Sequence, residues 1–176
     1  PQKAKALLAE AKYDLMPLNQ KEMIIYTNKD YADLVTYVVR QWQEIGVLAK
    51  IELLETATLR EKMRNGSLSF FRASWVADYP DEESFMTVFY SKNPAPPNYT
   101  RFKNEAFDRL YDKAIEEMDM DKRKKLFQDM DRIIIEEAPV IFLFYDQVAW
   151  FSQQNIQNLI GNPLNLLKLE SVNEKN

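Results

Sequence analysis

The chain has 176 residues, with 23 Lys and Arg against 27 Asp and Glu, a net charge of −4, and no Cys or His. A disulfide framework is therefore impossible, a zinc site is disfavoured, and the base of a Ser-His or Cys-His dyad is missing. The chain has only 3 Gly and no glycine-rich phosphate-binding motif, and no cofactor is predicted. Its net negative charge argues against nucleic acid as a partner.

Helices and strands are predicted to alternate at the start of the chain. Residues 3–12 are rich in helix formers, and residues 23–27 form a β-branched and aromatic run typical of a buried strand. Apolar residues recur with the helical period over residues 34–45, up to Gly46, and residues 47–54 alternate apolar and charged side chains. Strand, helix and strand in this order predict a right-handed parallel βαβ unit.

Two short helices around an extended stretch are predicted next. Thr58 and Glu61 have the spacing of a capping box, and Asn65-Gly66 is expected to end this helix. Residues 67–75 resume an extended pattern. Pro80 is followed by three acidic residues, a pattern typical of a first helical turn.

The second half of the chain is predicted to form a helical hairpin between a loop and two strands. Residues 91–99 contain three Pro and must be a loop. Asn104 precedes one amphipathic helix, and a second amphipathic helix continues until Pro139. The apolar residues 140–145 and 147–152 are strand candidates.

Acidic residues are densest from Asp78 to Glu83, where paired carboxylates suit general acid–base chemistry or a hard cation. Glu82 and Glu83 are expected to be a solvated first turn that compensates the helix dipole. Asp78 differs because it follows a buried-looking strand at a strand-to-helix junction, where ligands bind in many α/β folds. The spacing of a calcium-binding loop is absent.

Two further residues close to Asp78 are candidates for binding. Arg72 lies in an otherwise apolar and small stretch, so it is expected either to pair with a nearby carboxylate or to meet an anionic ligand. Trp75 suits a stacking wall, although single tryptophans are more often core residues. Trp42 and Trp150 are assigned to the core.

The residues from Arg72 to Asp81, RASWVADYPD, resemble the W-x-x-D-Y-P-D segment of the family 5 extracellular solute-binding proteins. These are the oligopeptide- and dipeptide-binding receptors of ABC importers. Other segments resemble the motifs of that family in the same order: residues 3–11 (KAKALLAEA), 42–47 (WQEIGV), 98–110 (NYTRFKNEAFDRL) and 138–145 (APVIFLFY). The set covers nearly the whole chain, so it is specific although each motif alone is weak.

The resemblance implies an α/β fold, a lobe of the type II periplasmic-binding-protein kind with a mixed sheet flanked by helices. It implies that Asp78 pairs with the α-ammonium group of a short peptide and that Trp75 lines a side-chain pocket. Arg72 would meet a peptide carboxylate or a structural partner. The implied partners are the peptide and an ABC permease in the membrane, and the implied location is extracytoplasmic, in the periplasm or as a lipoprotein on the cell envelope.

Members of the family are about three times longer, so the chain resembles the C-terminal lobe of a two-lobed receptor. We expect residues 1–154 to form the ligand-binding lobe and residues 155–176 to return toward the missing N-terminal lobe. The sequence also departs from the family. Lys12 stands where Gly is usual, and residues 56–65 lack the second Trp of many peptide receptors. Nickel- and sugar-binding relatives share the fold, although the absence of His disfavours a metal complex.

Three function classes follow from the sequence. The preferred hypothesis is a non-enzymatic binding lobe that captures short peptides, with Asp78 as the anchor of the amino terminus. The alternative is a carboxylate-dependent hydrolase that uses Asp78 with Asp81 or Glu82, which requires these side chains to converge in one cleft. A pure interaction module would dock the apolar tail, residues 159–169, on another subunit.

Overall fold

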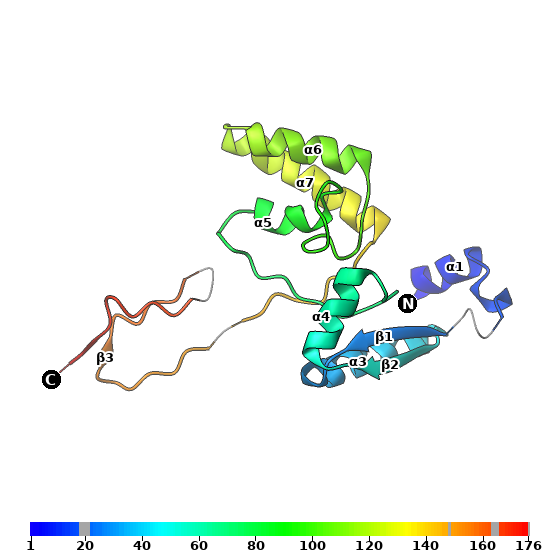
Figure 1. Ribbon diagram of the computed structural model, residues 1–176, viewed down its shortest axis with the longest axis horizontal. Helices are drawn as coiled ribbons and strands as arrows, with labels where there is room; N and C mark the ends of the chain where they lie inside the picture. The colour runs from blue at the N-terminus through cyan, green and yellow to red at the C-terminus, as the bar shows by residue number, and fades with distance from the viewer. Residues whose placement is uncertain (18–21, 148, 163–165, 176) are drawn as a thin grey trace. The chain divides into compact units, whose positions relative to one another are not determined.

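The structure is a computed structural model that describes residues 1–17, 22–147, 149–162 and 166–175. The chain divides into two compact units, Pro1–Ser74 and Trp75–Asn176, and each is described by itself. Helices and strands occur together, so the predicted α/β class is confirmed (Figure 1). The predicted boundary between residues 154 and 155 stays a prediction.

The first unit contains a parallel strand–helix–strand arrangement. Its elements are α1 (Gln2–Glu10), η1 (Tyr13–Leu15), β1 (Met23–Thr27), η2 (Lys29–Tyr31), α3 (Ala32–Glu44), β2 (Ala49–Leu53) and α4 (Thr56–Asn65). Strands β1 and β2 pair in parallel, in a register that places Met23 opposite Ala49 and Thr27 opposite Leu53. The parallel pairing predicted from the order of apolar patterns is therefore confirmed.

The core of the first unit lies where α3 meets the two strands. Ile25, Val35 and Val39 are buried there, and the ring of Trp42 meets Phe70 edge-on at 5.3 Å between centroids. Trp42 is a core-lining residue, as predicted.

The segment that leads to the candidate site runs along the free edge of β1. The amide of Tyr26 donates to the carbonyl of Phe70 at 3.0 Å, and the amide of Arg72 donates to the carbonyl of Tyr26 at 2.9 Å. The extended pattern predicted for residues 67–75 is realised here as a single parallel bridge, Tyr26 to Phe71. Residues just before the site are thus fixed by main-chain hydrogen bonds.

Helix α4 begins three residues earlier than a capping box at Thr58 predicts. Glu55 is its N-cap residue and makes no side-chain cap, so the capping box predicted at Thr58 is wrong because Thr58 lies inside the helix. Leu59 and Met63 are buried, as predicted. The helix ends at Gly66, whose left-handed φ of 71° suits glycine.

The second unit is built on a helical hairpin. Its elements are α5 (Glu83–Met86), η3 (Thr87–Phe89), α6 (Glu105–Glu116), α7 (Met120–Glu137), β3 (Ile156–Gln157) and β4 (Asn173–Glu174). Helices α6 and α7 lie side by side (Figure 1), as predicted. The side chain of Asn104 caps α6 by accepting from the amides of Ala106 and Phe107, and Asp119 caps α7 in the same way.

The hairpin encloses an aromatic and aliphatic core. Its buried members are Phe89, Phe107, Tyr111, Ala114, Phe127, Met130 and Ile134. Asn98 holds the proline-rich loop against this core. It is 2% exposed, and its side-chain amide donates to the carbonyls of Tyr90 and Phe102. This core provides the support on which the acidic segment before α5 is built.

The strands predicted at residues 140–145 and 147–152 are wrong for the described part of these segments, which has no regular secondary structure. Residues 141–145 are exposed despite their apolar side chains, and Trp150, predicted to be core, is 38% exposed. A strand needs a neighbouring edge to satisfy its backbone groups, and no described strand pairs with this segment. None of the described helices is long and apolar enough to cross a bilayer.

Candidate functional site

Asp78 presents a carboxylate that has no hydrogen-bond or ion-pair partner among the described residues. The residue is exposed and lies in a stretch without helix or strand, between Trp75 and the start of α5. Its backbone is fixed all the same, because its amide donates to Oγ of Ser84 at 3.2 Å. A fixed backbone with an unpaired charge leaves the side chain available to a cationic group.

Trp75 is half-buried and, like Asp78, is hydrogen-bonded to Ser84. Its indole Nε1 donates to the carbonyl oxygen of Ser84 at 2.6 Å. The N–H group of the indole is therefore hydrogen-bonded within the second unit. This hydrogen bond fixes the orientation of the ring.

Ser84 is the residue that brings the two candidates together, and the sequence analysis missed it. It lies in α5, is 2% exposed, and accepts from Trp75 through its carbonyl and from Asp78 through its hydroxyl. A serine inside a short acidic and apolar stretch carries no pattern that distinguishes it from an ordinary helix residue. Its role is visible only once the chain has folded back over six to nine residues.

Arg72 belongs to the first unit, where its guanidinium stacks on the ring of Tyr31 with 3.1 Å between Cζ and the ring centroid. No ion pair to Arg72 is present among the described residues. A cation–π contact is thus found in place of the salt bridge, which was one of the two alternatives expected for Arg72, and it does not neutralise the charge. The guanidinium keeps its positive charge and remains half-exposed.

Asp81 is part of a structural ion pair with α7. Arg123 donates to both of its carboxylate oxygens, Nη1 at 2.6 Å and Nη2 at 2.8 Å. These hydrogen bonds hold the pKa of Asp81 below its ordinary value, and one of the two oxygens, Oδ1, also accepts from the amide of Glu83 at 2.8 Å. Arg123 also donates from Nε to the carbonyl of Ala114 at 3.1 Å, so all three guanidinium nitrogens donate a hydrogen bond.

Glu83 is hydrogen-bonded to a residue of α6 and is only partly exposed to solvent. Its carboxylate accepts a hydrogen bond from the hydroxyl of Tyr111, and burial of Tyr111, followed by this hydrogen bond, raises the pKa of the phenol to about 12. Glu82 is exposed, as predicted. The solvated first turn expected for both residues therefore holds for Glu82 alone.

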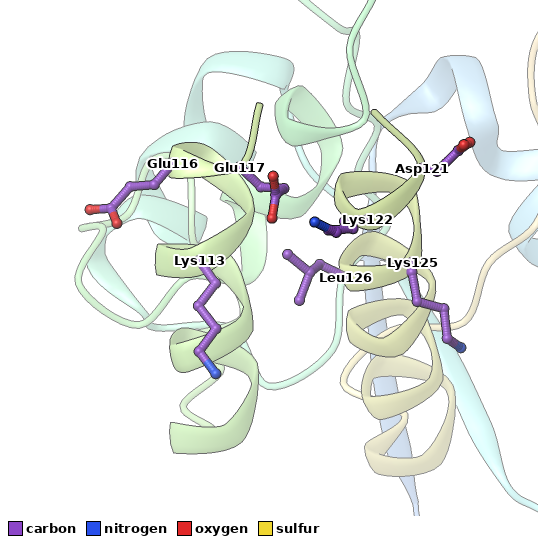
Figure 2. Close-up of a pocket in the computed structure, with 7 residues that line it drawn as sticks. All are labelled: Lys113, Glu116, Glu117, Asp121, Lys122, Lys125 and Leu126. Atoms are coloured by element: carbon purple, nitrogen blue, oxygen red, sulfur yellow. The ribbon is translucent and has the colours of Figure 1, made fainter. Parts of the chain in front are cut away.

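One pocket in the described part of the second unit is an open depression between α6 and α7, shown in Figure 2. Its lining is mostly charged and of both signs: Lys113, Glu116, Glu117, Asp121, Lys122, Lys125 and Leu126. None of the predicted site residues lines it. Among the described residues, no group of three or more acidic side chains is placed to hold a metal ion.

Comparison with known proteins gives a family and several relatives. The model of the bacterial extracellular solute-binding proteins, family 5 Middle, matches residues 1–97. Periplasmic murein peptide-binding protein MppA of Escherichia coli (strain K12) is 28% identical over 138 residues, which are 78% of this chain and 25% of that protein. Heme-binding protein A of Haemophilus influenzae is 29% identical over 150 residues, 80% of this chain and 26% of that protein.

Two solved structures show the same fold. The unliganded open form of MppA matches with a TM-score of 0.72 and 28% identity, over 78% of this chain and 27% of that chain. The DppA periplasmic binding protein of Helicobacter pylori, in complex with the peptide STSA, matches with a TM-score of 0.68 and 25% identity, over 78% and 27%. The predicted periplasmic-binding-protein fold is confirmed, and the chain spans about a quarter of the length of these relatives.

Proposed function

Because the chain belongs to the bacterial extracellular solute-binding proteins of family 5, we propose that it is the part of a peptide receptor that holds the amino-terminal ammonium group of a short peptide at Asp78. The receptor delivers the peptide to an ABC permease from an extracytoplasmic location. The observation that carries this proposal is the carboxylate of Asp78, which is exposed and unpaired among the described residues, on a backbone held by Ser84.

A carboxylate binds an ammonium group more favourably when no other partner in the protein competes for its oxygens. An ammonium group at Asp81 would have to compete for oxygens that already accept two hydrogen bonds from Arg123, whereas Asp78 has no described partner to compete with. An ammonium–carboxylate pair shielded from water is a charge-assisted hydrogen bond and is stronger than a neutral one. Trp75, held beside Asp78 through Ser84, supplies an apolar wall. Arg72 is proposed as a ligand-binding cation of the first unit.

The hydrolase alternative is weaker on this geometry. Asp81 is engaged by Arg123 at 2.6 and 2.8 Å and its pKa is lowered, so it is a poor general acid at neutral pH. Glu82 lines a small pocket with Arg123 and Lys124, and Asp78 does not line that pocket. The convergence of carboxylates that this alternative requires is not seen among the described residues.

Peptide is preferred over other ligands because one of the two matched structures is of a protein named for murein tripeptide binding and the other is a complex with the peptide STSA. The name of Heme-binding protein A states a different ligand for that relative. Receptors of this kind gain affinity by closing two lobes around the ligand. The chain spans only 25% of MppA and 26% of Heme-binding protein A. We therefore expect residues 1–176 alone to bind peptide weakly.

The test is a double-mutant cycle in the full-length receptor that carries this chain. The probes are the tetrapeptide Ser-Thr-Ser-Ala and its N-acetylated form, each titrated by calorimetry into the wild type and Asp78→Asn. We expect Asp78→Asn to weaken binding of the free amine by ~2 to 5 kcal/mol. N-acetylation should cost the wild type a similar amount and should cost the variant little, because the two changes remove the same ion pair.

The matched control is Glu82→Gln, which neutralises another exposed carboxylate four residues further along and should leave the affinity unchanged. Equal costs of N-acetylation in the wild type and in Asp78→Asn would remove Asp78 from the site. Micromolar or tighter binding of the tetrapeptide to residues 1–176 alone would contradict the two-lobe account.

A further inference from the structure

The stretch from Trp75 to Glu82 has no helix or strand to hold it, yet it carries both candidate ligand contacts of the second unit. Regular elements hold their side chains in place through ladders of main-chain hydrogen bonds, whereas residues 75–78 of this stretch make no described hydrogen bond between main-chain groups. Two of its polar groups are instead bound by one residue, Ser84. The indole of Trp75 meets the Ser84 carbonyl at 2.6 Å, and the amide of Asp78 meets the Ser84 hydroxyl oxygen at 3.2 Å.

Ser84 is itself firmly placed. It is 2% exposed, and its amide donates to the carbonyl of Asp81 at 3.1 Å. The residues beside it are attached to the hairpin, Asp81 to Arg123 of α7 and Glu83 to Tyr111 of α6. A continuous series of hydrogen bonds therefore runs from the helical core to the segment that carries the free carboxylate.

We propose that Ser84 is a positioning residue for ligand binding, whose hydroxyl oxygen fixes the backbone of Asp78 while its carbonyl fixes the indole of Trp75. The inference rests on the proposed function of Asp78. Without the hydroxyl, the amide of Asp78 loses its acceptor and the carboxylate must be ordered when the ligand binds. Such ordering on binding lowers the affinity, because the conformational entropy that Asp78 then loses makes the free energy of binding less favourable.

The variant Ser84→Ala separates the two contacts, because it removes the hydroxyl oxygen and keeps the carbonyl that binds Trp75. In the full-length receptor we expect it to weaken binding of Ser-Thr-Ser-Ala by about 3- to 10-fold, the effect of one neutral hydrogen bond. In the Asp78→Asn background the same substitution should change affinity by less than about 2-fold, since the positioned charge is already gone. Ser67→Ala removes an exposed hydroxyl of the first unit and serves as the matched control.

The outcomes separate the two proposals. If Asp78→Asn and N-acetylation of the peptide have no effect, the proposed function fails and this inference fails with it. If Asp78→Asn weakens binding but Ser84→Ala costs the same in both backgrounds, Ser84 is only structural and this inference alone is overturned.

A measurement on the unsubstituted receptor decides the matter if Ser84→Ala does not fold. Amide hydrogen exchange followed by NMR should show slower exchange at Asp78 than at Val76, which is 72% exposed and makes no described amide hydrogen bond. Equal exchange at the two amides would show that the hydroxyl of Ser84 does not hold Asp78.

Discussion

Two neighbouring stretches of the second unit use carboxylates in opposite ways. In residues 81–83, Asp81 accepts two hydrogen bonds from Arg123, and Glu83 accepts one from Tyr111. In residues 75–78, the backbone is held by Ser84 while the carboxylate of Asp78 has no described partner. The cluster of acidic residues thus divides into two sets: the paired acids hold the segment to the hairpin, and the unpaired acid, Asp78, is the one that we propose binds a ligand.

The largest effect is expected from the core under both stretches. Phe107 is 0% exposed and packs against Phe89 and Phe102, so Phe107→Ala should lower the free energy of unfolding by about 3 to 5 kcal/mol. Urea unfolding followed by circular dichroism measures this loss. Phe151→Ala is the control, because Phe151 is 94% exposed and its truncation should change stability by less than about 0.5 kcal/mol. Similar losses for both variants would contradict the assignment of the core.

The second effect tests whether Asp81 is structural. Arg123→Ala should lower the free energy of unfolding by about 1.5 to 3 kcal/mol, because the side chains of Arg123 and Asp81 are only 16% and 29% exposed and share charged hydrogen bonds. The control is Arg132→Ala at the exposed pair with Asp129, which should cost about 0 to 0.5 kcal/mol.

The same pair predicts a dependence of stability on acid pH. The hydrogen bonds from Arg123 lower the pKa of Asp81 below its ordinary value of 3.8. The folded state then binds fewer protons than the unfolded state in this range, so the contribution is complete above about pH 4 and is lost as the pH falls through the lowered pKa. Urea unfolding between about pH 2 and 6 should show a flatter profile in Arg123→Ala. An unchanged profile would mean that the pair does not stabilise the fold.

A smaller effect is expected from the hydrogen bond between Tyr111 and Glu83. Tyr111→Phe keeps the ring in the core and should cost about 0.5 to 1.5 kcal/mol. Because the pKa of Tyr111 is raised from 10.0 to about 12, the wild type should lose stability as the pH rises between these values, where only the unfolded state has released its proton. Stability measured at alkaline pH should fall less in Tyr111→Phe, and an equal fall would argue against a buried phenol.

The smallest effect on stability is expected at Asp78. Asp78→Asn should change the free energy of unfolding by less than about 0.5 kcal/mol, because no described group loses a partner. The same variant is expected to show the large loss of peptide affinity. A variant that is both unstable and inactive would place Asp78 with the structural acids and would remove the contrast between the two stretches.

The sequence predicted what depends on local pattern. Strand β1 and the Asn104 cap follow from short runs of residues with a clear period or a specific cap chemistry, and both are confirmed. The bonds from Asp81 to Arg123 and from Glu83 to Tyr111 join residues 42 and 28 positions apart, and no local pattern reports them. Ser84 was missed although its partners lie only six and nine residues away, because no local pattern distinguishes it from an ordinary helix residue.

The strand predictions at residues 140–145 and 147–152 show a different limit. Apolar and β-branched composition describes what a strand needs on its faces, but a strand also needs an edge to pair with, and the sequence does not say where that edge is. Phe151 and Tyr145, 94% and 87% exposed, show how far composition alone can mislead. The candidate residues Asp78, Trp75 and Arg72 were indicated by local sequence pattern, and their roles in peptide binding are implied by the resemblance. These roles stay predictions.

The central claim is that Asp78 holds the amino terminus of a peptide, and a crystal structure of the full-length receptor with Ser-Thr-Ser-Ala tests it most directly. We expect a carboxylate oxygen of Asp78 within about 2.7 to 3.2 Å of the peptide α-nitrogen, with the amide of Asp78 still hydrogen-bonded to Ser84. A peptide whose α-nitrogen contacts another group, with the Asp78 carboxylate left in solvent, would contradict the claim.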